Sequence, residues 1–254
     1  MATASSPMRS LERAIEVLEV LDSARGSLRL TEIAKRADLP VATTQRILAV
    51  LAAHDRVEHD ASGYRPGIAL TYGAHAFSTT NPLIRAARPI LIELAAVTGL
   101  TVTLFREHRD LRVVMSRAGN TRNFGYDLVV GSRLPLYLGA GKALLAQWED
   151  DEVRELLKHA PVGPGAPAVP EADALLEDLA QIRERGFSIS REERQPGVAS
   201  VAAAVPLEYG VRAAIQATGT VDDFPDEQHV AALGRQVQQA TLGVGLGLPH
   251  PAGD

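Results

Sequence analysis

The sequence predicts an α+β protein, with an N-terminal winged helix-turn-helix, a linker helix and a C-terminal domain of antiparallel strands and helices. Residues 28–64 show two short helical patterns, a tight turn and a hairpin. The second half mixes strand hairpins with helices and does not repeat a strand–helix–strand unit. A chain of 254 residues is also long enough for two cores. We expect a winged helix-turn-helix domain over 1–66, a linker helix over 67–81 and a second domain over 82–254.

The N-terminal region is expected to fold as three helices. Residues 1–8 are small and polar and are predicted to be disordered. A first helix then keeps apolar spacing until Gly26, through Leu11, Ala14, Ile15, Leu18 and Leu21. Thr31 is placed to cap a second, two-turn helix, and Asp38-Leu39-Pro40 separates it from a third. The third helix presents one apolar stripe to the core, made of Thr44, Ile47, Leu48 and Leu51.

The opposite face of the third helix carries the residue types of a DNA recognition helix. Small residues allow close approach, Gln can bind an adenine edge and Arg can bind guanine or a phosphate. The predicted contacts on this face are Ala42, Thr43, Gln45, Arg46 and Ala49. The alternative is a helical hairpin that contacts no nucleic acid.

A hairpin after the third helix would form the wing. Its turn is Asp60-Ala61-Ser62-Gly63, between Val57-Glu58-His59 and Tyr64-Arg65. Residues 1–80 carry nine basic and nine acidic side chains, so the net charge of −5 lies in the rest of the chain. Without a bulk basic field, DNA binding must depend on a few local contacts and on dimerisation. We predict that two to four basic residues contact DNA in each subunit, drawn from Arg9, Arg13, Arg29, Lys35, Arg36, Arg46 and Arg65, beside Tyr64.

The second domain is predicted to alternate hairpins and helices. A helix is expected over 83–98, followed by a hairpin of Leu100–Phe105 and Leu111–Ser116. Further strands are predicted at Tyr126–Val130, Phe187–Ser190, Val198–Val205 and Arg212–Thr218. Further helices are predicted at Gly141–Gln147, Asp151–His159, Ala172–Arg185 and Asp226–Thr241, with a loop over Pro161–Pro170.

Composition limits the function classes. The chain has no cysteine, which excludes disulfides and thiol chemistry and suits a reducing compartment. No window is apolar enough for a membrane span, and the N-terminus lacks a signal-peptide pattern. A cytoplasmic protein without a membrane partner is therefore expected.

Residues 10–76 resemble the DNA-binding domain of the IclR family of bacterial transcriptional regulators. The matching segments are Ser10–Leu18, Leu30–Ala34 and Asp38-Leu39-Pro40, with Thr43 and Arg46 downstream. Later segments match the family's effector domain in the expected order: Gly131–Ala146, Glu184–Phe187, Glu192-Glu193, Pro196–Val198 and Val201–Ala203. The resemblance implies an effector domain similar to GAF and PAS modules, a linker helix that helps to pair subunits, and assembly into homodimers or dimers of dimers.

A ligand site is predicted at the glycine-rich segment Gly139-Ala140-Gly141-Lys142. This helix start could offer backbone amides to an anion. It is not a phosphate-binding loop, because Leu136 and Ala143 replace its first glycine and its Ser/Thr. The alternative is that these glycines serve only close packing at the start of a helix. By position, the resemblance implies effector contacts from Gly139, Ala140, Gly141, Ser190, Val198 and Ser200, with apolar walls from Leu134 and Leu136.

Two features depart from the family pattern. The spacing from Pro135 to Gly141 is one residue shorter, which changes the turn around Leu138. Ser190 and Ser200 stand where other members carry an acid or a thiol, which alters the polarity of the pocket.

Enzyme, metal and cofactor chemistry have little support. Glu192-Glu193 could supply a general base, but the resemblance makes the pair structural. His54 and His59 lie in or beside the wing without ligand partners at metal spacing. The glycines at 243, 245 and 247 indicate a flexible tail and not a dinucleotide site. No cofactor, no metal site and no catalytic residue are predicted.

The sequence thus predicts a transcription factor that binds double-stranded operator DNA and responds to a small organic acid. Two other classes stay open. One is a metabolic enzyme or carrier that uses the winged helix for subunit contacts. The other is an architectural DNA-binding protein without a ligand.

Overall fold

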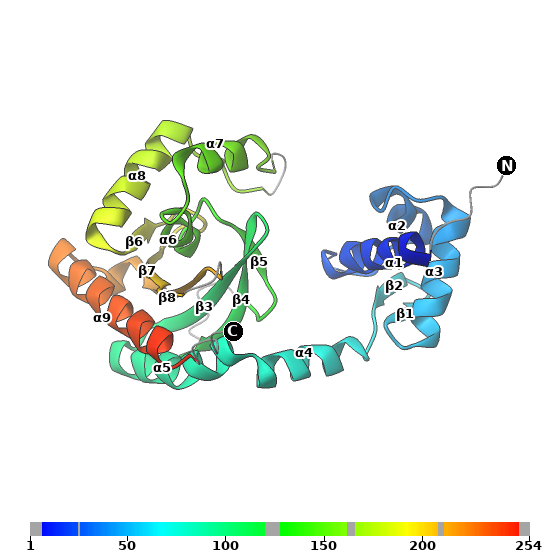
Figure 1. Ribbon diagram of the computed structural model, residues 1–254, viewed down its shortest axis with the longest axis horizontal. Helices are drawn as coiled ribbons and strands as arrows, with labels where there is room; N and C mark the ends of the chain where they lie inside the picture. Colours follow the sequence, from blue (N-terminus) through cyan, green and yellow to red (C-terminus); the bar gives the residue numbers. More distant parts are fainter. Residues whose placement is uncertain (1–6, 25, 120–127, 162–165, 208–210, 249–254) are drawn as a thin grey trace, which may run out of the picture. The chain divides into compact units, whose positions relative to one another are not determined.

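The computed structural model describes residues 7–24, 26–119, 128–161, 166–207 and 211–248 (Figure 1). The chain divides into two compact units, Met1–Thr79 and Thr80–Asp254. Each unit buries apolar side chains of its own.

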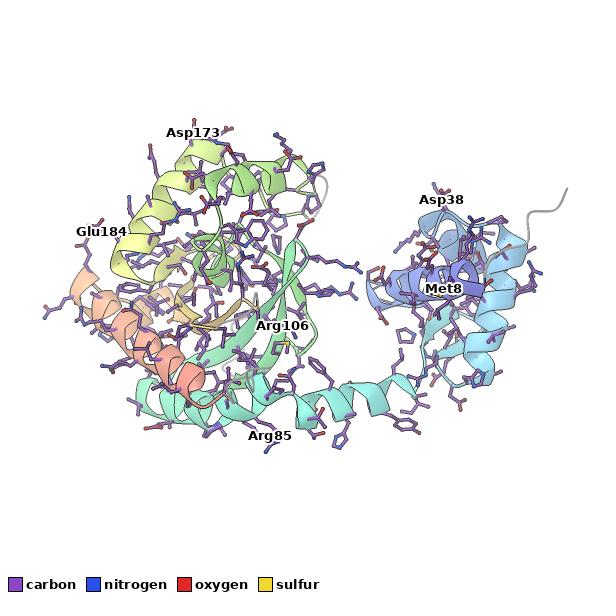
Figure 2. All side chains as sticks on the ribbon, viewed as in Figure 1. Met8, Asp38, Arg85, Arg106, Asp173 and Glu184 are labelled. Atoms are coloured by element: carbon purple, nitrogen blue, oxygen red, sulfur yellow. The ribbon has the colours of Figure 1, made fainter. Side chains whose placement is uncertain are left out.

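The first unit is a winged helix-turn-helix. Its elements are α1 (Pro7–Asp22), α2 (Leu30–Arg36), α3 (Val41–Ala53), the antiparallel pair β1 (Val57–Asp60) and β2 (Gly63–Pro66), and α4 (Leu70–Thr80). The three-helix core closes around Val17, Leu21, Leu28, Ile33, Leu48 and Val57. Leu28 also pairs with Tyr64 of β2, which joins the wing to the segment before α2. Figure 2 shows the side chains of this unit, with Met8 labelled on α1.

Two expectations for this unit are wrong. Disorder was expected over residues 1–8, but α1 already begins at Pro7, because proline is tolerated in the first turn of a helix; residues 1–6 lie outside the described part. Thr31 does not cap α2, which begins one residue earlier at Leu30. The side chain of Leu30 packs against the core and draws this residue into the first turn.

The second unit is a six-stranded antiparallel sheet with helices on both faces. Its strands are β3 (Thr101–His108), β4 (Leu111–Ala118), β5 (Arg133–Pro135), β6 (Ser188–Arg191), β7 (Val198–Val205) and β8 (Ala213–Thr220). They lie in the order β5-β4-β3-β8-β7-β6. The helices are α5 (Pro82–Thr98), α6 (Ala140–Leu145), α7 (Asp150–Lys158), α8 (Ala172–Arg185) and α9 (Glu227–Leu246), and a short 3-10 turn, η1 (Val221–Asp223), follows β8.

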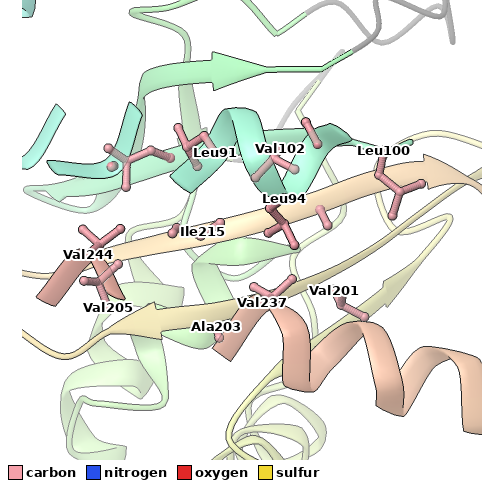
Figure 3. Close-up of a cluster of buried hydrophobic side chains, with 14 of the residues drawn as sticks. Leu91, Leu94, Leu100, Val102, Val201, Ala203, Val205, Ile215, Val237 and Val244 are labelled. Atoms are coloured by element: carbon pink, nitrogen blue, oxygen red, sulfur yellow. The ribbon is translucent and has the colours of Figure 1, made fainter. Parts of the chain in front are cut away.

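Alternation along the strands sends side chains to two different cores. Val201, Ala203, Ile215 and their alternate neighbours pack against α5 and α9 (Figure 3). The other face of the sheet, which includes Ala202 and Ala214, packs beneath α6 and toward α7 and α8 (Figure 1). The exposed side of α8 carries Asp173 and Glu184, which point away from this core (Figure 2).

Most predicted elements are confirmed. The bounds of α8 and β7 agree with the sequence prediction, and the β3–β4 hairpin turns at Arg109-Asp110. The strand predicted over Tyr126–Val130 is wrong where it can be compared, since residues 128–130 are not in a strand and residues 126–127 lie outside the described part. Strand β5 was not predicted, because its three residues are too few for an alternating pattern.

The glycines predicted to form a flexible tail belong largely to a helix. Helix α9 continues through Gly243 and Gly245 to Leu246. A Cβ at residue 245 would lie 3.0 Å from the carbonyl oxygen of Pro206, so this glycine lets α9 approach the segment after β7. Close packing therefore overrides the low helix propensity of glycine.

The close packing of Gly141 gives a testable prediction. A Cβ at residue 141 would lie 2.1 Å from the carbonyl oxygen of Leu136, which is backbone and cannot move aside. We expect Gly141→Ala to lower the free energy of unfolding by about 2 kcal/mol or more, as overpacked cores do. Urea denaturation of the full chain measures the change.

The matched control is Gly73→Ala in α4, where an added Cβ meets nothing within 4 Å. Alanine favours helix over glycine, so this variant should not lose stability. Equal stability of the wild type and Gly141→Ala would contradict the packing described here.

Candidate functional site

Helix α3 presents the predicted recognition face to solvent. Ala42, Gln45, Arg46 and Ala49 are exposed and Thr43 is half-buried. On the inner side, Thr44 and Leu48 are buried, and the Thr44 hydroxyl donates to the Pro40 carbonyl at 3.2 Å. The polar face is therefore held outward by a fixed core, as a recognition helix requires.

The basic residue of the wing, Arg65, is bound by acidic residues of the same hairpin. Arg65 of β2 donates from Nε to Glu58 Oε2 at 3.1 Å and also bonds to Asp60, both on β1. Tyr64 stacks on His59 with ring centroids 4.1 Å apart. Among the other predicted DNA contacts, Arg9 is exposed and Arg13 is half-buried on α1. The charge of Arg65 is thus already offset by two carboxylates, and a phosphate would compete with them.

The turn of the wing holds a strongly acidic carboxyl. The Ser62 hydroxyl and backbone amide donate to Asp60, the latter at 2.8 Å, and Arg65 lies on its other oxygen. These hydrogen bonds, with the charge of Arg65, lower the pKa of Asp60 to about 2. The turn therefore stays negatively charged through the physiological range.

The second unit contains a small, mostly polar cavity beside the start of α6, on the face of the sheet that α6 covers. Its lining comes from β4, β6, β7, β8, the turn before α6 and the segment between β6 and β7: Arg112, Leu138, Gly139, Ser190, Glu193, Arg194, Gln195, Val198, Ser200, Gln216 and Thr218. The volume is about 20 Å³, which is roughly the space of one water molecule.

Four of the predicted effector residues line this cavity: Gly139, Ser190, Val198 and Ser200. Leu134, Leu136 and Ala140 are instead buried in the apolar cluster beneath α6. Gly141 packs against the backbone of Leu136. Leu138, at the shortened turn, is buried and contributes to the lining.

The amides at the start of α6 are already paired, which corrects the expectation that they are open to a ligand. The Gly141 amide donates to the Leu138 carbonyl at 3.0 Å, and the Lys142 amide donates to Gly139 at 3.1 Å. The Gly139 amide donates to Glu193 Oε2 at 2.9 Å. Gly139 has φ +52°, a conformation that favours glycine.

Glu193 and Lys142 form a buried polar network beside the cavity. The Lys142 side chain is 7 % exposed, and its Nζ bonds to Glu193, to Asp178 Oδ2 at 2.7 Å and to the Ile189 carbonyl at 3.1 Å. Arg185 donates to the other oxygen of Asp178 at 3.3 Å. The network joins α6, α8, β6 and the segment between β6 and β7, so Glu193 has the structural role that the resemblance implied.

Five lining residues had not been singled out from the sequence: Arg112, Arg194, Gln195, Gln216 and Thr218. Arg112 is 1 % exposed, and its guanidinium carbon lies 5.1 Å from the centre of the Phe105 ring. Gln216 and Thr218 are also buried. For Gln216 and Thr218 a signal was available, because they alternate with Ile215, Ala217 and Gly219 along β8.

Other site types find no support in the described part of the chain. Its histidines and acids form no group of three or more that could hold a metal ion. Within the same residues, no helix is both long and apolar enough to cross a membrane.

The winged helix-turn-helix, with a cavity-bearing α+β unit on the same chain, defines a DNA-binding regulator with a ligand domain. The model of the IclR helix-turn-helix domain matches residues 10–61, and that of the bacterial transcriptional regulator IclR C-terminal domain matches residues 75–244. The chain belongs to the IclR family, whose members are transcriptional regulators and not enzymes.

Named relatives agree with this family. The HTH-type transcriptional regulator BhcR of Paracoccus denitrificans is 34 % identical over 79 % of this chain and 73 % of its own. The repressor AllR of Escherichia coli is 29 % identical over 88 % of this chain and 84 % of its own. The structure of a Microbacterium hydrocarbonoxydans IclR homolog in complex with 4-hydroxybenzoate is also similar, with a TM-score of 0.75 and 23 % identity. The match covers 94 % of this chain and 98 % of that chain.

The lowered pKa of Asp60 gives a testable prediction. A folded-state pKa of about 2, below the ordinary 3.8, stabilises the wing above about pH 4, and this contribution is lost as pH falls through 2. We expect Ser62→Ala to raise the pKa toward 3.8, since bonds from Ser62 are the largest causes of the shift. A carboxyl NMR titration of the full chain measures it.

The control for this titration is Ser78→Ala on α4, whose hydroxyl bonds only to the His75 carbonyl among the contacts described. It should leave the Asp60 titration in place. An unchanged Asp60 titration curve in Ser62→Ala would show that Ser62 does not lower the pKa of Asp60.

Proposed function

We propose that this protein regulates transcription in response to a small organic acid that binds in the cavity of its second domain. The observation that carries the proposal is the buried guanidinium of Arg112 in the cavity wall, beside the hydroxyl and amide groups of Ser200, Gln216 and Thr218. Arginine offers planar, charged donors that match a carboxylate. The nearby polar side chains supply further partners for an oxygen-rich ligand.

Acid binding requires the cavity to enlarge. Its volume of about 20 Å³ is too small for an organic acid, and Glu193, Arg194 and Gln195 between β6 and β7 form part of its lining. We propose that this segment moves when the acid enters. The ligand then stabilises the enlarged state and shifts the population toward it.

In the same proposal, α3 enters the major groove of operator DNA. Ala42, Thr43, Gln45, Arg46 and Ala49 face the bases and phosphates, with Arg9, Arg13, Tyr64 and Arg65 as further contacts. The exposure of the α3 face supports this assignment. The division into a DNA-binding domain (1–66), a linker helix (67–81) and an effector domain (82–254) belongs to the same proposal, as does a cytoplasmic location, where operator DNA is found.

We also propose a homodimer, assembling further as a dimer of dimers. Helix α4 buries none of its residues, and Tyr72 and Phe77 on it are 67 % and 48 % exposed. On α1, Leu11 and Ile15 are exposed as well. A short helix with exposed aromatic residues needs a packing partner, and a second copy of the chain would provide one.

The effector proposal predicts stabilisation by organic acids. A ligand at about 100 times its dissociation constant raises the free energy of unfolding by about 2.7 kcal/mol. A thermal-shift screen of the full chain against aliphatic and aromatic acids, including 4-hydroxybenzoate, should give hits that also change the affinity for operator DNA. Arg112→Met should weaken such a hit about tenfold or more, because a charge-assisted bond is lost.

Arg154→Met is the matched control, since Arg154 is an exposed side chain on α7 paired with Asp173. It should keep the wild-type response. An acid that binds equally well to Arg112→Met would remove Arg112 from the site, and silence across the panel would favour an architectural protein without a ligand.

The DNA-binding proposal predicts a loss in Arg46→Ala. Removing a base contact should cost about 1–3 kcal/mol of operator affinity, and removing a phosphate contact should lower the salt slope by about one. Fluorescence anisotropy with operator DNA at several salt concentrations distinguishes the two. Folding and oligomeric state should not change, because the side chain is exposed.

Arg154→Ala serves as the control for lost positive charge outside α3. Its affinity and salt slope should equal those of the wild type. An Arg46→Ala variant with unchanged affinity would place Arg46 outside the DNA contacts.

A further inference from the structure

Gln216 is a polar residue at the centre of the sheet. It lies on β8, between Thr103 of β3 and Ala202 of β7. Its neighbour Ile215 packs against α5 and α9, so alternation turns Gln216 toward the other face, where it lines the cavity. The residue is only 4 % exposed.

Half of the Gln216 amide is satisfied. Its Nε2 donates to the Ser200 hydroxyl oxygen at 2.6 Å, which holds this end of the amide. Its Oε1 is buried and has no hydrogen-bond donor among the residues that the structure describes. A buried acceptor without a donor costs about 1–3 kcal/mol, which a ligand that donates to it would recover.

The amide lies next to the guanidinium of Arg112. A Cβ built on Gly139 would be 3.3 Å from Arg112 Nη2 and 3.5 Å from Gln216 Nε2, so both groups lie against the same point of the backbone. A carboxylate that binds Arg112 therefore brings its nearest carbons close to Gln216. The group on those carbons decides whether Oε1 receives a hydrogen bond.

We infer that Gln216 selects hydroxy acids, with the hydroxyl one or two carbons from the carboxylate. This inference rests on the proposed function and goes further, since it names the ligand class and the residue that recognises it. The carboxylate accepts from Arg112, and the hydroxyl donates to Gln216 Oε1. An oxo acid of the same carbon skeleton has only acceptors at that position and leaves Oε1 without a partner.

The test compares matched pairs of acids on the full-length wild-type protein. Isothermal titration calorimetry with lactate against pyruvate, and 3-hydroxybutyrate against acetoacetate, gives the ratio of dissociation constants within each pair. We expect at least one hydroxy acid to bind about tenfold more tightly than its oxo partner. This comparison needs no variant and so does not depend on the folding of one.

Variants then assign the preference to Gln216. Gln216→Met keeps the length of the side chain and removes the amide, so the ratio within the pair should fall to about one while both acids still bind. Ser200→Ala, which removes the partner that orients the amide, should also lower the ratio. Gln236→Met makes the same chemical change at an exposed position of α9 and should keep the wild-type ratio.

The outcomes separate this inference from the proposed function. Acids that bind without a hydroxyl preference, or with a preference for the oxo acid, overturn the inference and leave the acid-responsive regulator in place. A preference that survives in Gln216→Met also overturns it. If none of the four acids binds, the inference falls; if the wider acid screen is also silent, the proposed function falls with it.

Discussion

The sheet of the second domain is covered on both faces, and this constraint decides where its polar groups can lie. Seven of the eight residues of β8 are buried, and seven of the eight residues of β7 belong to one of the two cores or line the cavity. Toward α5 and α9 the face is apolar throughout, as Val201, Ala203 and Ile215 show. On the other face, Ser200, Gln216 and Thr218 gather beside the start of α6. The cavity therefore lies where polar side chains replace apolar ones on the buried face of the sheet.

A buried ammonium group keeps this region in one arrangement. Lys142 on the short helix α6 has Glu193 and Asp178 as partners, and removing either would leave a charge with incomplete compensation. Because Glu193 also accepts from the Gly139 amide, the same carboxylate fixes the turn before α6 and the segment that borders the cavity. Packing and charge thus reinforce each other: Gly141 allows α6 to lie against Leu136, and Lys142 ties α6 to α8.

The sequence predicted the fold well because its signals are local. Helix α8 and strand β7 have strong periodicity, and the wing has a turn whose residue types specify it, so their positions agree with the structure. The cavity was predicted only in part. Gly139, Ser190, Val198 and Ser200 were found through family position, but Arg112 and Gln216 enter the cavity through strand register. The alternation within β8 shows that Gln216 faces away from Ile215, but which strand lies beside it depends on pairing with Thr103 of β3, far earlier in the chain.

The errors have the same origin. Glycines 243 and 245 suggested a flexible tail, yet α9 needs a small residue where it approaches Pro206. The amides at Gly139 and Gly141 suggested an open anion site, yet distant residues and the turn itself already pair them. For Gly245 and Gly139 the missing information was a contact between segments far apart in the chain, whereas for Gly141 it was a bond within the local turn to Leu138.

The hydrogen bond from the Gly139 amide to Glu193 also has a consequence for selectivity. A carboxylate held on the same chain acts at an effective concentration of millimolar or more toward its own partner. Dilute free anions such as acetate must compete with this internal ligand for the amide, and they have no second polar group that could bind other cavity residues. A molecule that engages several cavity residues at once can displace it. The tethered carboxylate thereby sets a concentration threshold below which unspecific anions leave the domain unchanged.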